Sequence, residues 1–486
     1  MNNLYARLKV LTVITFVVAL TGCAGTRTVD QKSAAADLAT SNFKAYAQKY
    51  IDAKGNPTYD PKSLLDTLEA GKAFNDAGMW DKSQEAFDAA SSMMMWKEDT
   101  VATPEGVANL VGTTLTNDTF GPYTGKIFQG GLIDYYQAMN SLMMGDEATA
   151  RVNFNRVAVR QSNAVTQFDA FTKTSSDSVN QGFGEKGAET AQKSFMDVAP
   201  KTNDGTKDIP TGLTKAKIRN ASADFMSAIF RSTSAAGAAD KSGGLARATL
   251  RDAGSAAATQ GGTALIGGLD KSLQAGQGAI QGKVIVVYED GTGPGFSEFR
   301  IDLPLFLVTS KVTYTGIALP RFQQGKPAFG GLKLGAKNDA TVVMTNLNDL
   351  AGLEFDAAYK GIVAKAVVST IIKTVAQAAI NTAADKATGG GVMGTLLKLG
   401  TGAAQAALTK ADTRAWINLP NTIQIGFIDR PANGSLAIAA ADGRPLAQVQ
   451  LAEAPNNLVV VKASGLGGKP AVFSQALPVL SPALGL

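Results

Sequence analysis

The chain has 486 residues, of which 45 % are apolar, and its 46 Lys and Arg residues outnumber its 41 Asp and Glu residues by only five. Histidine is absent and there is one cysteine, which excludes a Ser-His-Asp triad, a Cys-His pair, a zinc finger, a haem histidine and an internal disulfide. The basic excess is not gathered into clusters, so we expect no nucleic-acid partner.

The first element predicted in chain order is a signal peptide over residues 1–22. Arg7 and Lys9 precede the uncharged stretch Val10–Gly22. This stretch has the length of the apolar core of a signal peptide and is too short to span a bilayer. Removal of the signal peptide takes away two bases and no acid, and it lowers the formal charge from +5 to +3.

The signal peptide ends at the single cysteine. Residues 20–23 read LTGC, which resembles the lipobox of bacterial lipoproteins. The resemblance implies a covalent diacylglyceryl group and an N-acyl chain on Cys23, no other cofactor, and the outer-membrane bilayer as a partner. In this resemblance the residue after the cysteine decides the destination membrane, and Asp there would change it. Ala24 therefore implies the outer membrane, with the protein on its periplasmic face. The alternative is an ordinary secretory signal with a chance cysteine. Residues 23–40 are predicted to be the lipidated tether.

An α-helical domain is predicted over residues 41–255. Its pattern repeats an apolar helix, a short turn and a second helix with small residues at its centre. The stretches with this pattern are Ser63–Ser91, Gly131–Val159 and, less regularly, Ala223–Gly254. They resemble tetratricopeptide-type (TPR) helical hairpins, although their spacing is irregular.

The sequence of the second half of the chain predicts mainly strands. Residues 256–282 are rich in Gly and Ala and predict a flexible connector. From Lys283 the apolar period changes to two, which predicts a β-rich domain over residues 283–465. Its first two strands are expected to pair with each other around the Gly/Pro turn Gly291–Gly295.

Two Ala-rich helices are predicted as an insertion in this domain, at about residues 355–410. Lys360, Lys365 and Lys373 interrupt the first helix, so we expect the pair to pack on the sheet and not to cross a membrane. Residues 466–486 are rich in Gly and Pro and predict a flexible tail. The predicted fold class is α+β, with N-terminal TPR-like helical hairpins followed by a β-rich domain.

A wider resemblance joins the two halves. The helical half, together with FRIDLPLF (299–306), VTYTGIALP (312–320) and ADTRAWINLP (411–420), resembles an uncharacterised family of TPR-like bacterial envelope lipoproteins. The resemblance covers most of the mature chain and is strongest over residues 283–428. It implies location and architecture, and it brings no activity, ligand or catalytic residue with it.

Four consecutive residues are candidates for contact with a partner. Met93, Met94, Met95 and Trp96 would cover more than half the circumference of a helix, so part of the run must be buried or bind something. Methionine suits a surface that accommodates varied apolar partners. The alternative is a core position at the end of a hairpin.

Two further candidates lie in the β-rich half. Alternation places Glu298, Arg300 and Asp302 on one face of a strand, where they form a ladder of ion pairs or Arg300 binds a partner's carboxylate. Trp416 stands before a strand; tryptophan is frequent at binding hot spots, but it also packs in cores.

These observations favour a protein that is not an enzyme. We expect a lipid-anchored, periplasm-facing scaffold or protein-interaction lipoprotein of the bacterial outer membrane, with an unidentified envelope protein or peptide as its partner. Two alternatives stay open, a regulator of peptidoglycan synthesis and a carboxylate-dependent enzyme acting on glycan.

Overall fold

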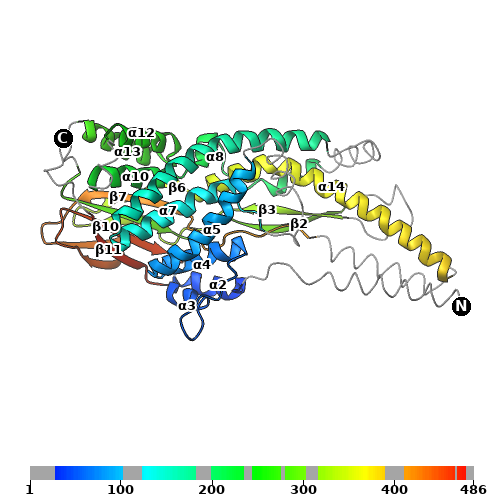
Figure 1. Ribbon diagram of the computed structural model, residues 1–486, viewed down its shortest axis with the longest axis horizontal. Helices are drawn as coiled ribbons and strands as arrows, with labels where there is room; N and C mark the ends of the chain where they lie inside the picture. Colours follow the sequence, from blue (N-terminus) through cyan, green and yellow to red (C-terminus); the bar gives the residue numbers. More distant parts are fainter. Residues whose placement is uncertain are drawn as a thin grey trace.

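Helices fill the first half of the molecule and strands dominate the second (Figure 1), which confirms the predicted α+β class. The structure is a computed structural model. It describes residues 28–101, 123–181, 199–234, 243–274, 280–302, 316–388, 410–465 and 468–477. No helix within these ranges is both long enough and apolar enough to span a bilayer.

The three predicted helix pairs are present. They are α4 (Leu64–Asp76) with α5 (Trp80–Val101), α7 (Ile127–Met144) with α8 (Glu147–Gln181), and α10 (Ala221–Thr233) with α12 (Gly243–Ala256). Gly78 and Gly145 make the turns of the first two pairs with φ of +76° and +74°, a conformation that favours glycine. Ser63 and Asn220 begin α4 and α10, because their side chains accept hydrogen bonds from backbone N–H groups of the first turn.

The predicted tether differs from the structure. Thr28 is the first described residue, and residues 31–39 form helix α2 (Gln31–Ala39), which is followed by the short helix α3 (Phe43–Gln48). Ala34 and Leu38 of α2 are buried in a core shared with α3 and α4. The spacing of these two residues places them on one helix face, and burial of that face fixes α2 to the body.

The largest sheet has five strands in the order β11-β10-β1-β7-β6. These strands are β1 (Lys283–Asp290), β6 (Val342–Asn346), β7 (Thr422–Asp429), β10 (Asn456–Ala463) and β11 (Ala471–Leu477). β1 lies at the centre, parallel to β10 and antiparallel to β7. The sheet is therefore assembled from segments that are distant in the sequence.

The two faces of this sheet are buried against different layers. Ile285 and Val287 of β1 belong to the large core with the helices, whereas Val284, Val286 and Tyr288 belong to a second core. Because successive side chains of a strand point to opposite faces, a continuous apolar run is needed when both faces are covered. The central strand is therefore buried on both sides.

The layer on the far side of the sheet is a smaller sheet in the order β5-β4-β8-β9. Its strands are β4 (Leu332–Leu334), β5 (Asp339–Ala340), β8 (Ser435–Ala440) and β9 (Pro445–Gln450). A separate pair consists of β2 (Gly295–Asp302) and β3 (Gly316–Gln323).

The predicted pairing of the first two strands is wrong, because β1 pairs with β10 and β7 and β2 pairs with β3. The turn between β1 and β2 explains the difference. Gly291 N donates to Ala463 O at 2.6 Å and Gly293 N donates to Leu419 O at 2.6 Å. These bonds direct the chain out of the five-stranded sheet, so β2 begins a new layer.

The predicted connector also differs from the structure. Within residues 256–282 lies helix α13 (Gln260–Gln274), whose Ile266 and Leu269 are buried. Helical spacing of these apolar residues gives α13 a face to pack, which outweighs the helix-weakening effect of its glycines.

The predicted flexible tail contains strand β11. This strand adds to the edge of the sheet by antiparallel pairing with β10. The ring of Phe473 lies 5.0 Å from that of Trp80, between ring centroids, so the strand also contacts the helical layer. Residues 478–486 lie outside the described residues.

The inserted Ala-rich pair is described in part. Helix α14 (Leu347–Thr388) is one continuous helix that extends away from the sheets along the long axis of the molecule (Figure 1). Its first half packs against α8 and β3, with the ring of Phe355 at 6.1 Å from that of Phe322 on β3. The second predicted helix, Val392–Lys410, lies almost entirely outside the described residues.

Candidate functional site

The residues predicted for membrane attachment, Cys23 and Ala24, lie outside the described residues. In the methionine run, Met93 is half-buried and Met94 is 5 % exposed. Met95 lies on α5 with Trp96, and the structure describes only their backbone.

Met94 is therefore a core residue, the alternative to a partner contact that the sequence left open. It belongs to the large core that α4, α5 and α7 share. The sulfur of Met94 lies close to Gly125, which also neighbours Leu64 of α4, so the side chain points into this core.

Arg300 is paired within its own strand. Its Nε donates to Glu298 Oε1 at 2.9 Å, and Glu298 Oε2 accepts from the backbone N–H of Ala411 at 2.8 Å. The predicted ion-pair ladder is confirmed for these two charges. The Arg300 side chain stays 39 % exposed.

Trp416 is 2 % exposed, so it packs in the core, the second of the two roles that the sequence left open. Its ring lies 6.0 Å from Phe87 and 6.2 Å from Tyr136, and these two rings stack on each other at 5.7 Å. Aromatic pairs at this separation stabilise a core beyond their buried area. The loop that carries Trp416 is thereby fixed to α5 and α7.

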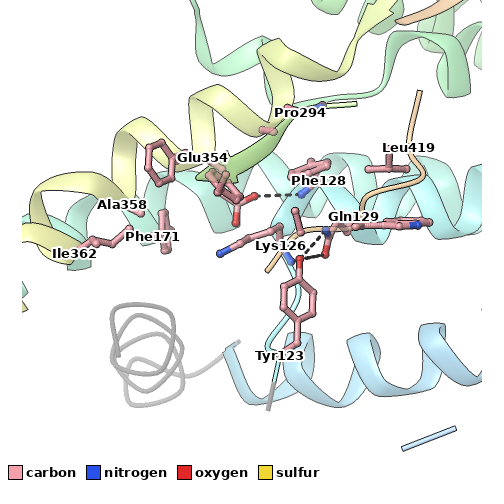
Figure 2. Close-up of a pocket in the computed structure, with 15 residues that line it drawn as sticks. Tyr123, Lys126, Phe128, Gln129, Phe171, Pro294, Glu354, Ala358, Ile362 and Leu419 are labelled. Carbon is pink, nitrogen blue, oxygen red and sulfur yellow. Dashed lines mark hydrogen bonds between the residues drawn. The ribbon is translucent and has the colours of Figure 1, made fainter. Parts of the chain in front are cut away.

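Trp416 also lines a narrow cavity of about 40 Å³ between the start of α7, the start of α14, strand β2 and the loop before β7 (Figure 2). Six of its 15 lining residues are aromatic, namely Tyr123, Phe128, Phe171, Phe296, Phe355 and Trp416. A water needs roughly 10–15 Å³ of such space, so the cavity has room for a few waters or a small group that displaces them.

Glu354 of α14 is the one acid among the described lining residues of this cavity. Its Oε2 accepts a hydrogen bond from the backbone N–H of Phe128 at 3.5 Å, and Figure 2 shows the carboxylate directed at the start of α7. Burial raises the pKa of Glu354, while Lys126 and the N–H groups of Ile127 and Phe128 oppose the rise. Glu354 therefore places a hydrogen-bond acceptor at the positive end of a helix.

A second polar group holds the same helix end. Gln129 Oε1 accepts from the backbone N–H of Lys126 at 2.9 Å, and the Gln129 amide is hydrogen-bonded to the Tyr123 hydroxyl. The Arg414 guanidinium lies 5.9 Å from the Tyr123 ring centroid. The cavity is thus an apolar chamber with a few fixed polar groups, the composition of a small binding site. Glycan hydrolysis by two carboxylates has no support at this cavity, because its described wall holds only one.

Sequence reasoning missed a second feature, a buried cluster of four charges that we call the charge quartet. It consists of Lys72 and Asp76 of α4, Glu289 of β1 and Lys462 of β10. Lys72 Nζ lies 2.8 Å from Glu289 Oε2 and is bonded to Asp76, while Lys462 Nζ lies 3.1 Å from Asp76 Oδ1 and 3.5 Å from Glu289 Oε1. The quartet is neutral and joins the helical layer to the centre of the sheet.

Polar and aromatic neighbours complete the quartet. Lys462 is also bonded to Asn75, whose amide donates to Asn140 Oδ1 at 2.7 Å. The Lys72 ammonium lies 5.1 Å from the Tyr136 ring centroid and the Lys462 ammonium 5.9 Å from that of Trp80. Buried charges of this kind persist only when each has partners on several sides.

The pKa shifts follow from this environment. Burial alone would raise the pKa of Glu289, but the ammonium groups of Lys462 and Lys72 prevail and lower it. Burial opposes charge on Lys72, and the carboxylates of Asp76 and Glu289 nonetheless raise its pKa. Burial lowers the pKa of Lys462. A lysine within the apolar strand sequence VVVKA was the one signal in the sequence that pointed to this feature.

Asp224 on α10 is a further buried acid. Its Oδ2 accepts from Arg219 Nε at 3.1 Å and from Arg219 Nη2 at 3.0 Å, and Nη2 also lies 3.2 Å from the exposed Asp252. Burial raises the pKa of Asp224 from 3.8 to about 6, although Arg219 acts in the opposite direction. Asp224 is therefore expected to make stability depend on pH.

We expect the difference in unfolding free energy between the wild type and Asp224→Asn to change by about 3 kcal/mol between about pH 4 and pH 7. The folded state holds the Asp224 proton more tightly than the unfolded state, so this contribution is complete below pH 3.8 and is lost as the pH rises through about 6. Urea unfolding at several pH values measures it. Asp339→Asn, at an exposed position on β5, should leave the pH dependence almost unchanged; an equal slope in wild type and Asp224→Asn would contradict the assignment.

Comparison with known proteins adds no identification. No family model, curated protein or solved structure matches the chain. Within the described ranges, no group of three or more Cys, Asp and Glu side chains is arranged to hold a metal ion.

Proposed function

We propose that the protein is a lipid-anchored interaction protein on the periplasmic face of a bacterial outer membrane, and that it acts by binding and not by catalysis. The observation that carries the proposal is the LTGC sequence, which follows a basic start and an uncharged apolar stretch in the order of a lipoprotein signal. Acyl chains on one residue suffice for anchoring, since a second chain makes membrane binding stable.

The folded body supports this proposal in two ways. Its residue Thr28 lies only five residues after the predicted attachment point, and the body is held by a shared core and the charge quartet. The cavity at Glu354 gives an envelope protein or peptide a place to insert a small apolar group beside a carboxylate. We propose this cavity as the point of contact with the partner.

The anchor is tested with Cys23→Ser and Ala24→Asp. Mass spectrometry of the native protein should find Cys23 as the amino-terminal residue with acyl chains attached. Cys23→Ser should move the protein from the membrane fraction to the soluble fraction, whereas Ala24→Asp should keep it on a membrane and change which membrane. An unmodified Cys23, or an uncut amino terminus, would overturn the proposal.

The contact point is tested by photocrosslinking in living cells. A photoreactive amino acid at Tyr123, beside the cavity, should yield a covalent adduct with one envelope protein, and the same probe at Lys337, exposed elsewhere, should not. Addition of Glu354→Gln should reduce the Tyr123 adduct. An adduct at Lys337 and none at Tyr123 would show that the partner binds another surface.

A further inference from the structure

We propose that helix α2 and the loop Asp52–Lys62 form the face that lies on the phospholipid headgroups of the bilayer. We call this surface the membrane face. The inference rests on the proposed acylation of Cys23 and adds an orientation to it. It follows from how little chain separates the attachment point from the folded body.

Five residue steps lead from Cys23 to Thr28. An extended chain spans at most about 3.6 Å per residue, so the acylated residue lies within about 18 Å of Thr28. The tether is therefore short compared with the molecule, since helix α8 alone has 35 residues and spans about 52 Å at 1.5 Å per residue. The surface around Thr28 therefore stays next to the bilayer.

Thr28 cannot swing away from the body. Its backbone N–H donates to Asp66 Oδ1 at 3.0 Å and its hydroxyl donates to Asp66 Oδ2 at 2.5 Å. Asp66 is fully buried in the first turn of α4, and Val29 beside Thr28 is buried in the core. The tether thus ends on a rigid point and gains no slack from the folded side.

The same carboxylate holds the loop of the membrane face. Asp66 Oδ2 accepts from the backbone N–H of Asp60 at 2.8 Å, and the Thr28 hydroxyl lies 3.5 Å from the carbonyl oxygen of Thr58. Asp52 stiffens the tip of the loop by accepting from the N–H groups of Lys54 and Asn56, each at 2.8 Å. Figure 1 shows this loop, which follows α3, projecting from the side of the molecule that carries α2.

The membrane face suits contact with headgroups. Lys32, Lys54 and Lys62 are exposed on it and alternate with the exposed carboxylates of Asp30, Asp52 and Asp60. The exposed large hydrophobic residues of the described chain lie elsewhere, on α7, α8 and α12. This face therefore rests on the headgroup layer without inserting, and the short tether sets its orientation.

The single cysteine allows a direct test. In the acylated protein Cys23 is blocked, so a cysteine introduced by Lys54→Cys, Lys62→Cys or Arg251→Cys is the only free thiol. Each variant receives a fluorophore and is reconstituted into phosphatidylcholine vesicles that carry a nitroxide quencher on the headgroup. Arg251 is exposed on α12, on the side of the molecule opposite α2 in Figure 1.

We expect quenching to remove about half or more of the fluorescence at positions 54 and 62 and little at position 251, because only the first two lie within reach of the tether. A twenty-residue Gly/Ser insertion after Gly25 spans about 25 Å on average and should reduce the quenching at positions 54 and 62 toward that at position 251.

The outcomes separate the two proposals. If the acylated protein binds vesicles but position 251 is quenched as strongly as position 54, the membrane face is wrong and the anchor stands. If positions 54 and 62 stay quenched in the variant with the long tether, the face binds lipid by itself. The proposal that the short tether sets the orientation would then be wrong. If the native protein carries no acyl chain and does not bind vesicles, the proposed function fails first.

Discussion

Glu289→Gln is expected to lower the free energy of unfolding by about 3–5 kcal/mol, because it leaves the charge quartet with two lysines and a single carboxylate. Lys72 loses the carboxylate 2.8 Å away, and Lys462 loses the one at 3.5 Å. Water cannot replace these contacts, since both lysine side chains are 2 % exposed. Urea unfolding of purified mature protein measures the loss.

Two controls distinguish an unpaired charge from a general defect. Asp169→Asn breaks the ion pair with Lys215, whose side chain is 61 % exposed, and should cost less than about 1 kcal/mol. The double variant Lys72→Met with Glu289→Leu keeps the pair of Asp76 and Lys462 and leaves the site neutral. It should be more stable than Glu289→Gln alone. A Glu289→Gln variant as stable as Asp169→Asn would contradict the account of the quartet.

The local pattern of the sequence predicted the helical half well. Apolar residues at helical spacing, such as Leu64, Leu65 and Leu68, place α4 in the large core, and glycine at the turns ends the first helix of two pairs. Both signals are carried by residues within a few positions of one another. A single sequence is therefore enough to detect both signals.

Strand partners could not be predicted in the same way. The run of apolar residues in β1 indicates that a strand forms, yet the choice of β10 and β7 over the adjacent β2 depends on hydrogen bonds such as that from Gly291 to Ala463. Composition was misleading for α13 and β11, where apolar residues such as Ile266 and Phe473 find partners in distant segments. Tertiary packing decides these elements and outweighs local propensity.

The candidate site was predicted only in part, for the same reason. Trp416 was singled out, but Glu354 was not, because one glutamate within a long Ala-rich helix looks like a solvated residue. Its role arises from the start of α7, more than two hundred residues earlier in the chain. The charge quartet likewise draws on three elements, and only the fold brings them together.

Trp416→Ala is the second variant with a large expected effect, a loss of about 3–5 kcal/mol in unfolding free energy, because truncation of a buried ring leaves a void that its neighbours fill incompletely. The void would open beside Phe87 and Tyr136 and join the cavity at Glu354. Urea unfolding of Trp416→Ala and Trp416→Phe measures the effect, and the phenylalanine variant should lose much less.

The same variants decide whether Trp416 serves the partner as well as the core. Leu245→Ala, at a side chain that is 44 % exposed, should change the stability by no more than about 0.5 kcal/mol and provides the surface control. Trp416→Phe keeps most of the packing but removes the indole N–H, which has no hydrogen-bond acceptor among the described residues. If Trp416→Phe folds normally and the Tyr123 photocrosslink weakens, the indole contributes to binding at the cavity. If the crosslink is unchanged while Trp416→Ala unfolds easily, Trp416 acts only through the stability of the wall.

A Trp416→Ala variant as stable as Leu245→Ala would contradict the core assignment. Shortening a side chain that faces solvent or an absent partner changes the stability of the free protein little.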